Sequence, residues 1–320
     1  MPVGEVLGVA VALYRSEDVI ADCLSSLKAS QGAQLRVVLA DNASPDDTCA
    51  VVRAWARAHL APQDFAEATP GGAARADAWL TLLHLPANGG FAHATNRALE
   101  LLLADPAIGN FWLLNPDCRA DPHAAAAYLR AAGEGPYALI GGRTLYIDPP
   151  GMIQSEGGRV SRWTGVCTSL GAGCPHPETP PSDPATLDYV SGANCLASRT
   201  FIERAGLMDE GYFLYYEEVD WAQRRGDLPL RLAGDALAAH RGGSAIGSGT
   251  HHRRASPLSL YWNHRSRMRY LRRHNPAALP LAWLRALAKA AQVLLRGDAH
   301  GARAVIAAIT GRRLHSWAPA

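Results

Sequence analysis

The first 136 residues alternate short apolar runs with amphipathic stretches of similar length. VLGVAVAL, LRVVLAD, WLTLLHL and FWLLNPD are typical of buried strands, and DVIADCLSSLKAS, DDTCAVVRAWARAHL and ATNRALELLLA are typical of the helices between them. This alternation predicts a parallel sheet covered by helices, and right-handed crossovers then favour a Rossmann-like half-domain. A polar, Ala- and Gly-rich stretch over residues 62–77 interrupts the alternation, and we expect a surface loop there.

The pattern changes after Tyr137. ALIGGRTLY is followed by a Gly- and Pro-rich stretch over residues 148–184. Such a stretch predicts antiparallel strands, hairpins and a long mobile loop. The sheet should therefore become mixed in its second half.

From Ser256 the chain is helical again. Pro276 and Pro280 separate a first helix from a second one that runs roughly over Leu281–Leu295, because proline ends a helix or stands in its first turn. We find no internal repeat. The expected division is a main domain and a helical C-terminal appendage, at residues 1–255 and 256–320.

The composition allows a sizeable core and gives no global electrostatic signal. Of the 320 residues 48% are hydrophobic, and 31 basic residues nearly balance 29 acidic ones, for a formal net charge of +2. This balance offers no argument for nucleic-acid binding. Between Arg253 and Arg313, however, thirteen Lys and Arg residues accompany a single acid, Asp298. This basic end, which also contains Leu and Trp, could lie on an anionic membrane surface. It could equally be an ordinary helical cap on the core.

Targeting and redox signals are sparse. The N-terminal apolar run is short and lacks both a basic leader and a small-residue cleavage site, so we expect a strand there and a cytoplasmic protein. No segment offers about 18 uninterrupted apolar residues, which argues against a membrane-spanning helix. Six cysteines are scattered without a CxxC pair, which argues against a zinc knuckle and against a disulfide scaffold.

Polar residues follow the predicted parallel strands, at the sheet edge where ligands bind in such folds. Asp41 could accept hydrogen bonds from a nucleobase or ribose, or could belong to the start of the next helix, for which Ser44 is the expected cap. Asn88 and Gly90 belong to an NGG turn that permits close backbone approach to a ligand at a helix N-terminus. Asn96 adds a polar group about one helical turn further on.

A carboxylate also ends the strand FWLLNPD. Asp117 could bind Mg²⁺ or Mn²⁺, which typically use one or two protein carboxylates together with phosphate oxygens and water. The alternative is a turn or cap residue, a role that Asp121 fills better. His240 follows the apolar run LRLAGDALAA and is a candidate additional ligand, although a lone histidine is more often structural.

The segment FLYYEEVDW crowds three carboxylates, Glu217, Glu218 and Asp220, next to aromatic residues. Repulsion among them should raise the pKa of one, which would then be suited to take a proton. A solvated helix start is the alternative, since acids there complement the helix dipole. The flanking FLYY and Trp221 favour a functional cluster.

Together these motifs resemble the inverting nucleotide-sugar glycosyltransferases of the GT-A fold, glycosyltransferase family 2, and in particular the bacterial rhamnosyltransferase-like branch. The resemblance covers roughly Val6 to Arg273 and follows seven motifs in order: VALYRSEDVIADCLSSL, DNAS, NGGFAHATN, LLNPD, SGANCLASR, FLYYEEVDW and HRGGS. It implies a Rossmann-like, mostly parallel sheet flanked by helices, with a nucleotide-binding half at about 1–136 and a mixed, antiparallel acceptor-side half at about 137–255.

The resemblance also implies roles on the donor side. It assigns nucleotide-sugar contacts to five residues, Asp41, Asn88, Gly90, Asn96 and Asn115. It makes Asp117 the metal carboxylate. The family usually has an acid where Asn115 stands, which gives His240 more weight as a further ligand of Mg²⁺ or Mn²⁺. Arg15 and Ala94 replace the usual Asn and Gly, so the donor sugar stays open.

On the acceptor side the resemblance makes Glu218 the catalytic base, at a position where the family usually has Asp. Glu217 and Asp220 are expected to share the role, because three crowded acids titrate as a coupled set. Small residues match the acceptor loop and leave room for a sugar ring. The acceptor-side residues are Gly192, Ala193, Asn194 and Trp221.

The implied reaction is a single displacement with inversion, in which the base removes a proton from the acceptor hydroxyl and a metal stabilises the leaving diphosphate. The donor is a nucleotide sugar, with rhamnose as one candidate, and the acceptor is a glycan or lipid-linked saccharide of cell-surface polysaccharide synthesis. The expected location is cytoplasmic, with the C-terminal helices on the inner membrane face and no nucleic-acid partner.

Two alternatives stay open at this stage. A nucleotidyltransferase shares the parallel sheet and a metal carboxylate, but usually carries a Gly-rich loop with a basic residue after the first strand, which ALYRSED lacks. A non-catalytic sugar-binding protein on a transferase scaffold would not need the acids of FLYYEEVDW.

Overall fold

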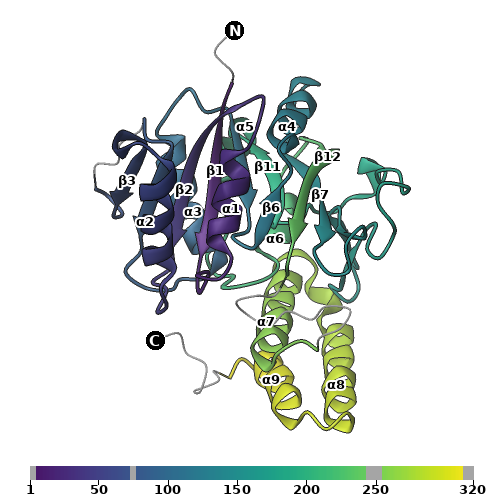
Figure 1. Ribbon diagram of the computed structural model, residues 1–320. Helices are drawn as coiled ribbons and strands as arrows, with labels where there is room; N and C mark the ends of the chain where they lie inside the picture. Colours follow the sequence, from purple (N-terminus) through teal and green to yellow (C-terminus); the bar gives the residue numbers. More distant parts are fainter. Residues whose placement is uncertain (1–4, 73–76, 243–253, 313–320) are drawn as a thin grey trace.

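The structure is a computed structural model that describes residues 5–72, 77–242 and 254–312. A ten-stranded sheet runs through these residues in the order β3-β4-β2-β1-β5-β11-β7-β12-β6, with β8 paired to β7 (Figure 1). This mixed α/β architecture confirms the predicted fold class. The last two residues of the HRGGS motif, Gly243 and Ser244, lie outside the described residues, as do Arg253 and Arg313 of the basic end.

Strands β1, β2, β4 and β5 follow the apolar runs of the first half and pair with one another in parallel, and β3 pairs in parallel with β4. Their carboxyl ends therefore share one edge of the sheet, where the register pairs Leu13 with Asp41 and Asp41 with His84. The strands are β1 (Val6–Leu13), β2 (Gln34–Asp41), β3 (Phe65–Ala68), β4 (Leu80–His84), β5 (Asn110–Leu114), β6 (Cys118–Ala120), β7 (Leu139–Tyr146), β8 (Ile153–Ser155), β9 (Gly158–Val160), β10 (Cys167–Ser169), β11 (Asn194–Ser198) and β12 (Leu230–His240).

Helices cover both faces of the sheet, and each face has its own hydrophobic cluster. Ile20 of α1 and Val52 of α2 belong to one cluster, and Leu99 of α3 and Phe201 of α5 belong to the other. The helices are α1 (Ile20–Lys28), α2 (Thr48–His59), α3 (Phe91–Leu103), α4 (Ala124–Gly133), α5 (Arg199–Ala205), α6 (Glu217–Gln223), α7 (Pro257–His274), α8 (Leu279–Leu295) and α9 (Ala299–Thr310).

The second half of the sheet is mixed, as predicted. β11 lies antiparallel between β5 and β7, while β12 runs parallel to β7 and antiparallel to β6. The antiparallel register sets His240 directly opposite Cys118, next to the end of β5. Residues 148–184 contain β8 and the antiparallel pair β9 and β10, which confirms the expected hairpin.

The stretch from Pro62 to Asp77 is not simply a loop. It begins with the 3-10 helix η1 (Pro62–Asp64) and continues into β3, which pairs in parallel with β4 at the sheet edge. Four residues are too few to show a strand period in the sequence, and an edge strand needs only one partner. Glu67 of β3 accepts hydrogen bonds from Arg53 and pairs with His84, which fixes the edge to its neighbours.

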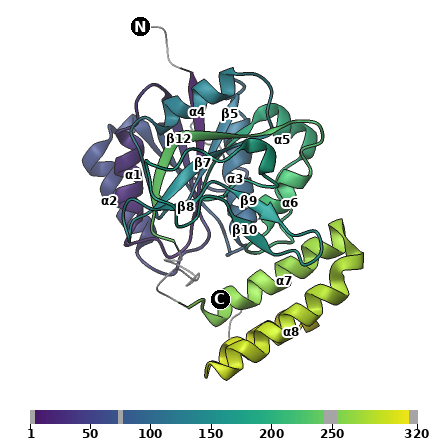
Figure 2. The same cartoon turned by 90° about the vertical axis from the view of Figure 1, so that its right-hand side faces the viewer.

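Helices α7, α8 and α9 extend from one end of the sheet domain (Figures 1 and 2), and α9 packs against both of the others. α8 starts two residues earlier than predicted, because Pro280 lies in its first turn, where the absent N–H breaks no helical hydrogen bond. The sequence pattern did not separate α9 from the helix before it.

The segment Pro276–Leu295 is long and apolar enough to cross a membrane by length and composition, with a mean hydropathy of 1.3, and 28% of it is buried. Arg285 and Lys289 interrupt this segment, so the sequence contains no uninterrupted apolar run of about 18 residues, and length and composition alone do not show a membrane span. The outer side of α8 exposes leucines, among them Leu284 (64% exposed) and Leu295 (89%).

Candidate active site

The NGG turn is tied to the end of β2 by the side chain of Asn42. Its Nδ2 donates to the carbonyl of Gly90 (2.9 Å), and its Oδ1 accepts from the amide of Gly89 (3.0 Å). Asp41, 4% exposed, lies at the same edge, where its carboxylate accepts from the amide of Ser44 (3.3 Å). Asp41 and the NGG turn thus share one site. Ser44 is not the predicted helix cap, because α2 begins only at Thr48 and Ser44 Oγ accepts from the amide of Arg15.

Gly90 brings a distant segment to this edge. Its φ of +93° lies in the left-handed region that favours glycine. A Cβ at this position would lie 2.2 Å from the carbonyl oxygen of Phe213, which accepts from the amide of Phe91 (2.9 Å). The residues that lead into the acidic cluster therefore lie directly against the NGG turn.

Asn96 holds the same distant segment from the other side. Its amide group exchanges hydrogen bonds with the backbone of Met208 (2.9 and 3.0 Å) and also donates to Glu210 (3.0 Å). The side chain is 2% exposed. In the structure Asn96 therefore positions the segment around Met208 and Glu210, whereas the sequence predicted that it borders a nucleotide.

Asp117 and His240 meet at the end of β5. Asp117 Oδ1 lies 3.0 Å from His240 Nε2, and the two side chains are 6% and 12% exposed. His240 Nδ1 is bound to Gln154 Oε1, an atom that can only accept, so Nδ1 carries the proton. Nε2 faces Asp117 and also Nδ2 of Asn115 (3.4 Å).

This donor set fits a divalent cation. Ligand atoms of Asp117, Cys118 and His240 lie within 4.8 Å of one another, and a histidine ligand whose second nitrogen binds an amide or carboxylate oxygen is the usual arrangement at metal sites. Burial raises the pKa of the Cys118 thiol well above its usual range, and its Sγ donates to the carbonyl of Ala193. Asp117 and His240 are therefore the ligands that suit Mg²⁺ or Mn²⁺.

Glu217 and Glu218 open helix α6. Glu217 is 5% exposed, and in each carboxyl group Oε2 is buried without a hydrogen-bond partner among the described residues. Burial raises the pKa of Glu217 well above its usual range, and the charge of Glu218 adds to the shift. Burial raises the pKa of Glu218 to about 7. Glu218 can therefore take up a proton near neutral pH.

The two residues before α6 adopt strained backbone conformations. Tyr215 and Tyr216 have φ angles of +64° and +70°, a region that bulky side chains rarely occupy. Their hydroxyl groups hold them there, since Tyr215 bonds Ser259 of α7 (2.8 Å) and Tyr216 donates to the carbonyl of Gly165 (2.6 Å). Strain of this kind persists where the surroundings over-determine the conformation, often at functional sites.

Asp220 does not share the role of the two glutamates. It is fully buried and lies 3.0 Å from Arg224 and 2.8 Å from His274, and it accepts from the hydroxyl of Tyr212. Side chains of the protein thus occupy both carboxylate oxygens. The structure therefore sets Asp220 apart from the two glutamates, with which the sequence grouped it, partly through His274 of α7, a residue far away in the sequence.

Only part of the predicted acceptor loop faces the acids. A Cβ at Gly192 would lie 3.6 Å from Cβ of Glu218, so this glycine leaves open space beside the carboxylate. Ala193 is buried, and its carbonyl accepts from the amide of Asn115 (3.0 Å). The loop thereby joins the end of β5 to α6.

Asn194 and Trp221 are core residues rather than acceptor contacts. Asn194 is fully buried, and its amide bonds Trp112, Tyr128 and the carbonyl of Ala236. Trp221 is also fully buried and donates to the carbonyl of Gly206 (2.8 Å). The sequence placed both residues on the acceptor side, whereas the structure satisfies their polar groups inside the core.

Sequence reasoning missed Gln154. Gln154 orients His240 from β8, a strand far from it in the sequence, and no local signal marks such a residue. Asn42 follows Asp41 directly and fixes the NGG turn.

Comparison with known proteins gives one family. The model of glycosyl transferase family 2 matches residues 8–205. N-acetylglucosaminyl-diphospho-decaprenol L-rhamnosyltransferases from two strains of Mycobacterium tuberculosis are 28% identical to this chain over 240 residues, which cover 69% of this chain and 71% of theirs.

Two solved structures share the fold. Mannosyltransferase PcManGT from Pyrobaculum calidifontis, in complex with GDP-Man and Mn²⁺, aligns with a TM-score of 0.50 at 17% identity over 96% of this chain and 86% of its own. S. aureus TarS in complex with UDP-GlcNAc aligns with a TM-score of 0.50 at 14% identity over 86% of this chain and 70% of its own. At these identities the likeness concerns the fold.

Proposed function

Because this chain belongs to glycosyl transferase family 2, we propose that it moves a sugar from a nucleoside-diphosphate donor to an acceptor hydroxyl, with inversion at the anomeric carbon. The single observation that carries the proposal is Glu218. Its carboxyl group has a pKa of about 7, an unpartnered buried oxygen and the open space at Gly192 beside it. These are the properties of a general base that works near neutral pH.

The donor binds at the carboxyl edge of the parallel strands in this proposal. Asp41 and the turn formed by Asn88 and Gly90 contact the nucleoside, and the amides at the start of α3 face its phosphates. Asn115 contacts the donor beside the cation ligands. The backbone hydrogen bond that follows Gly90, from the Phe91 amide to the Phe213 carbonyl, keeps this donor region next to the acids.

Asp117 and His240 would hold a divalent cation, Mg²⁺ or Mn²⁺. When bound, the cation would supply positive charge beside the departing nucleoside diphosphate. Gln154 keeps the His240 ring oriented, and Asn115 approaches the same nitrogen. Glu218 removes the proton from the acceptor hydroxyl as the oxygen attacks the anomeric carbon, and Glu217 stays protonated beside it because burial and the Glu218 charge raise its pKa further.

The acceptor is a lipid-linked saccharide and the transferred sugar is a hexose such as rhamnose. The names of the Mycobacterium tuberculosis relatives support this, since they describe an L-rhamnosyltransferase acting on a sugar linked through diphosphate to decaprenol. Residues 1–255 then carry the chemistry, and residues 256–320 lie against the cytoplasmic membrane face, with the exposed leucines of α8 at the lipid surface. A non-catalytic sugar-binding protein would not need a carboxyl poised near neutral pH.

Replacement of the proposed base tests this function. Glu218→Gln keeps the size of the side chain but cannot accept a proton, so turnover should fall roughly 100- to 10,000-fold while donor binding persists. Release of nucleoside diphosphate from a panel of UDP-, GDP- and dTDP-sugars with Mn²⁺ measures turnover, and thermal shift measures donor binding.

Glu203→Gln on α5 is the matched control. Glu203 is 61% exposed, and its substitution removes the same charge at a position away from the site. Its turnover should equal that of the wild-type chain. Unchanged turnover in Glu218→Gln would remove Glu218 from the role of base, and no turnover of any donor by the wild-type chain would contradict the enzymatic proposal.

A further inference from the structure

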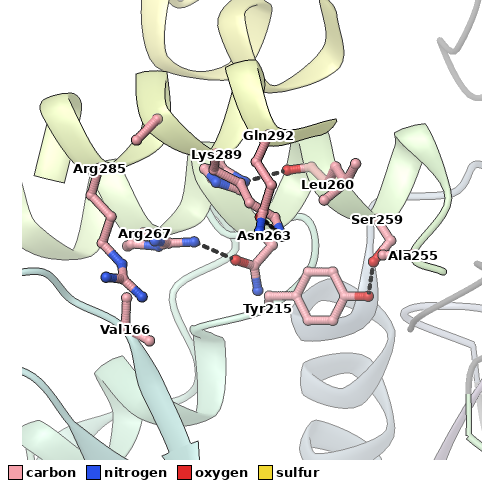
Figure 3. A pocket seen from close by; sticks show the side chains of 12 residues that line it. Val166, Tyr215, Ala255, Ser259, Leu260, Asn263, Arg267, Arg285, Lys289 and Gln292 are labelled. Atoms are coloured by element: carbon pink, nitrogen blue, oxygen red, sulfur yellow. Dashed lines mark hydrogen bonds between the residues drawn. The ribbon is translucent and has the colours of Figure 1, made fainter. Parts of the chain in front are cut away.

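A cavity of about 740 Å³ lies where α7 and α8 meet the sheet domain (Figure 3). Ser259 and Asn263 of α7 line one side, and Gln292 of α8 lines another. Val166 and Tyr215 of the sheet domain close the inner end. The cavity is thus separate from the strand edge proposed for the donor and opens between the C-terminal helices.

Three cationic side chains reach this cavity: Arg267 of α7, and Arg285 and Lys289 of α8. Among the described residues none of the three has a carboxylate within ion-pair distance. Arg267 is 7% exposed, and its Nε is buried without a hydrogen-bond partner. A buried cation without an anionic partner is costly.

The partners that these cations do have are neutral. Arg267 donates to Asn263 Oδ1 (2.8 Å), and Lys289 donates to Gln292 Oε1 (3.0 Å). His264 also lines the cavity, and burial together with the charge of Arg267 lowers its pKa to about 4, so it is uncharged at neutral pH. Among the described residues, the lining of the cavity therefore holds three cationic side chains and no carboxylate. An anion with several oxygens suits it.

The cavity adjoins the acids of α6. Tyr215 lines it and stands directly before Tyr216 and the two glutamates, and its hydroxyl bonds Ser259 in the cavity wall. Cys167, next to Val166, lies close enough to both Glu218 and Arg267 for each charge to act on its thiol. A ligand whose anionic part occupies the cavity could therefore extend a neighbouring group toward Glu218.

The other side of α8 is apolar. Leu281, Leu284, Leu287 and Leu295 are 44–89% exposed, and Ala288 lies between this apolar side and the cavity it lines. A molecule with a charged group in the cavity could therefore lay an apolar chain along α8.

We propose that the cavity between α7 and α8 binds the diphosphate of an isoprenoid-diphosphate-linked saccharide, with the isoprenoid chain along the leucines of α8 and the saccharide directed toward Glu218. The proposal rests on the proposed transferase function and specifies its acceptor subsite. Arg267, Arg285 and Lys289 are the residues that hold the diphosphate.

Titration calorimetry with farnesyl diphosphate, in EDTA so that no metal bridges the probe to the strand edge, tests the subsite. The Arg285→Ala/Lys289→Ala variant should bind at least about tenfold more weakly than the wild-type chain, since a charge-assisted hydrogen bond contributes on this scale. Both side chains lie on the helix surface, so the fold should be retained, and circular dichroism checks this. Arg303→Ala/Arg312→Ala removes the same charge from exposed positions outside the cavity and should bind like the wild-type chain.

Three further probes identify the ligand class. Farnesol and inorganic pyrophosphate should each bind more weakly than farnesyl diphosphate, because each lacks one half of the ligand. Equal binding of either probe, or equal losses in the two double variants, would overturn the proposal. Phosphatidylglycerol vesicles that bind with the same dependence on Arg285 and Lys289 would assign the cavity to lipid headgroups instead.

The outcome separates this inference from the proposed function. Nucleotide-sugar turnover by the wild-type chain requires no isoprenoid probe, so failure of farnesyl diphosphate to bind an active enzyme would overturn the subsite alone. Binding of the probe by a chain that turns over no donor would leave the subsite standing and contradict the transferase proposal.

Discussion

At the scale of single residues, three neighbouring acids differ because of what each one touches. Asp220 is bound to Arg224 and His274 in the core. Glu217 and Glu218 have no such side-chain partners, and burial raises the pKa of both carboxyl groups. One cluster in the sequence thus supplies a structural anchor and two carboxyl groups of raised pKa.

The pH dependence of turnover follows from the pKa of Glu218. A base must be deprotonated to act, so turnover should be low below pH 6, rise through a pH of about 7 and level off above it. Initial rates at saturating donor, measured from pH 5.5 to 9, check this. A rate that is flat across this range, or that falls as the pH increases through 7, would contradict the assignment.

At the scale of elements, the NGG turn joins the donor edge to the acidic helix through the backbone of Phe213. Gly90→Ala should destabilise the chain by roughly 3 kcal/mol, because the new Cβ would lie 2.2 Å from the Phe213 carbonyl and φ is +93°. Denaturant unfolding measures this free energy.

Gly133→Ala is the control for that substitution. Gly133 lies in the last turn of α4, and a Cβ there meets nothing within 4 Å. The change should be neutral or stabilise the chain by up to about 1 kcal/mol. Equal changes in the free energy of unfolding for the two substitutions would mean that contact with Phe213 does not cause the loss of stability in Gly90→Ala.

The sequence predicted most elements because apolar periodicity directly reflects which side of an element is buried. β2, β5 and α3 lie where their runs predict them, and Asp41 ends its strand as expected, whereas Asp117 lies in the turn that follows β5. The pairing of β12 with β6, which brings His240 to Asp117, depends on contacts between segments that are far apart in the sequence.

The missed roles have the same physical origin. Asn194 and Asn96 are polar residues in conspicuous motifs, yet their hydrogen bonds go to buried groups of other elements. A sequence shows that a polar residue is present but not whether a distant carbonyl or indole will satisfy it inside the core.

At the scale of the whole molecule, the C-terminal helices present an apolar surface away from the sheet domain. We expect the chain to float with phosphatidylglycerol-containing vesicles, and Leu284→Ser/Leu295→Ser should weaken this binding, since each leucine contributes roughly 1.5–3 kcal/mol when buried. Vesicle flotation measures the bound fraction.

Trp163→Ser is the control, because Trp163 is 55% exposed but belongs to the loop between β9 and β10 rather than to α8. Its flotation should match that of the wild-type chain. A wild-type chain that stays in solution, or a leucine variant that floats equally well, would contradict membrane contact through α8.

Helix α7 is the C-terminal helix that contacts buried residues of the sheet domain. His274 and Arg273 at its end approach Asp220, and Ser259 near its start bonds Tyr215. The same helix thus touches α6 at one end and the strained residues before it at the other. The C-terminal helices are therefore not an exchangeable module, because replacing α7 would also remove the partners of Asp220 and Tyr215 in the sheet domain.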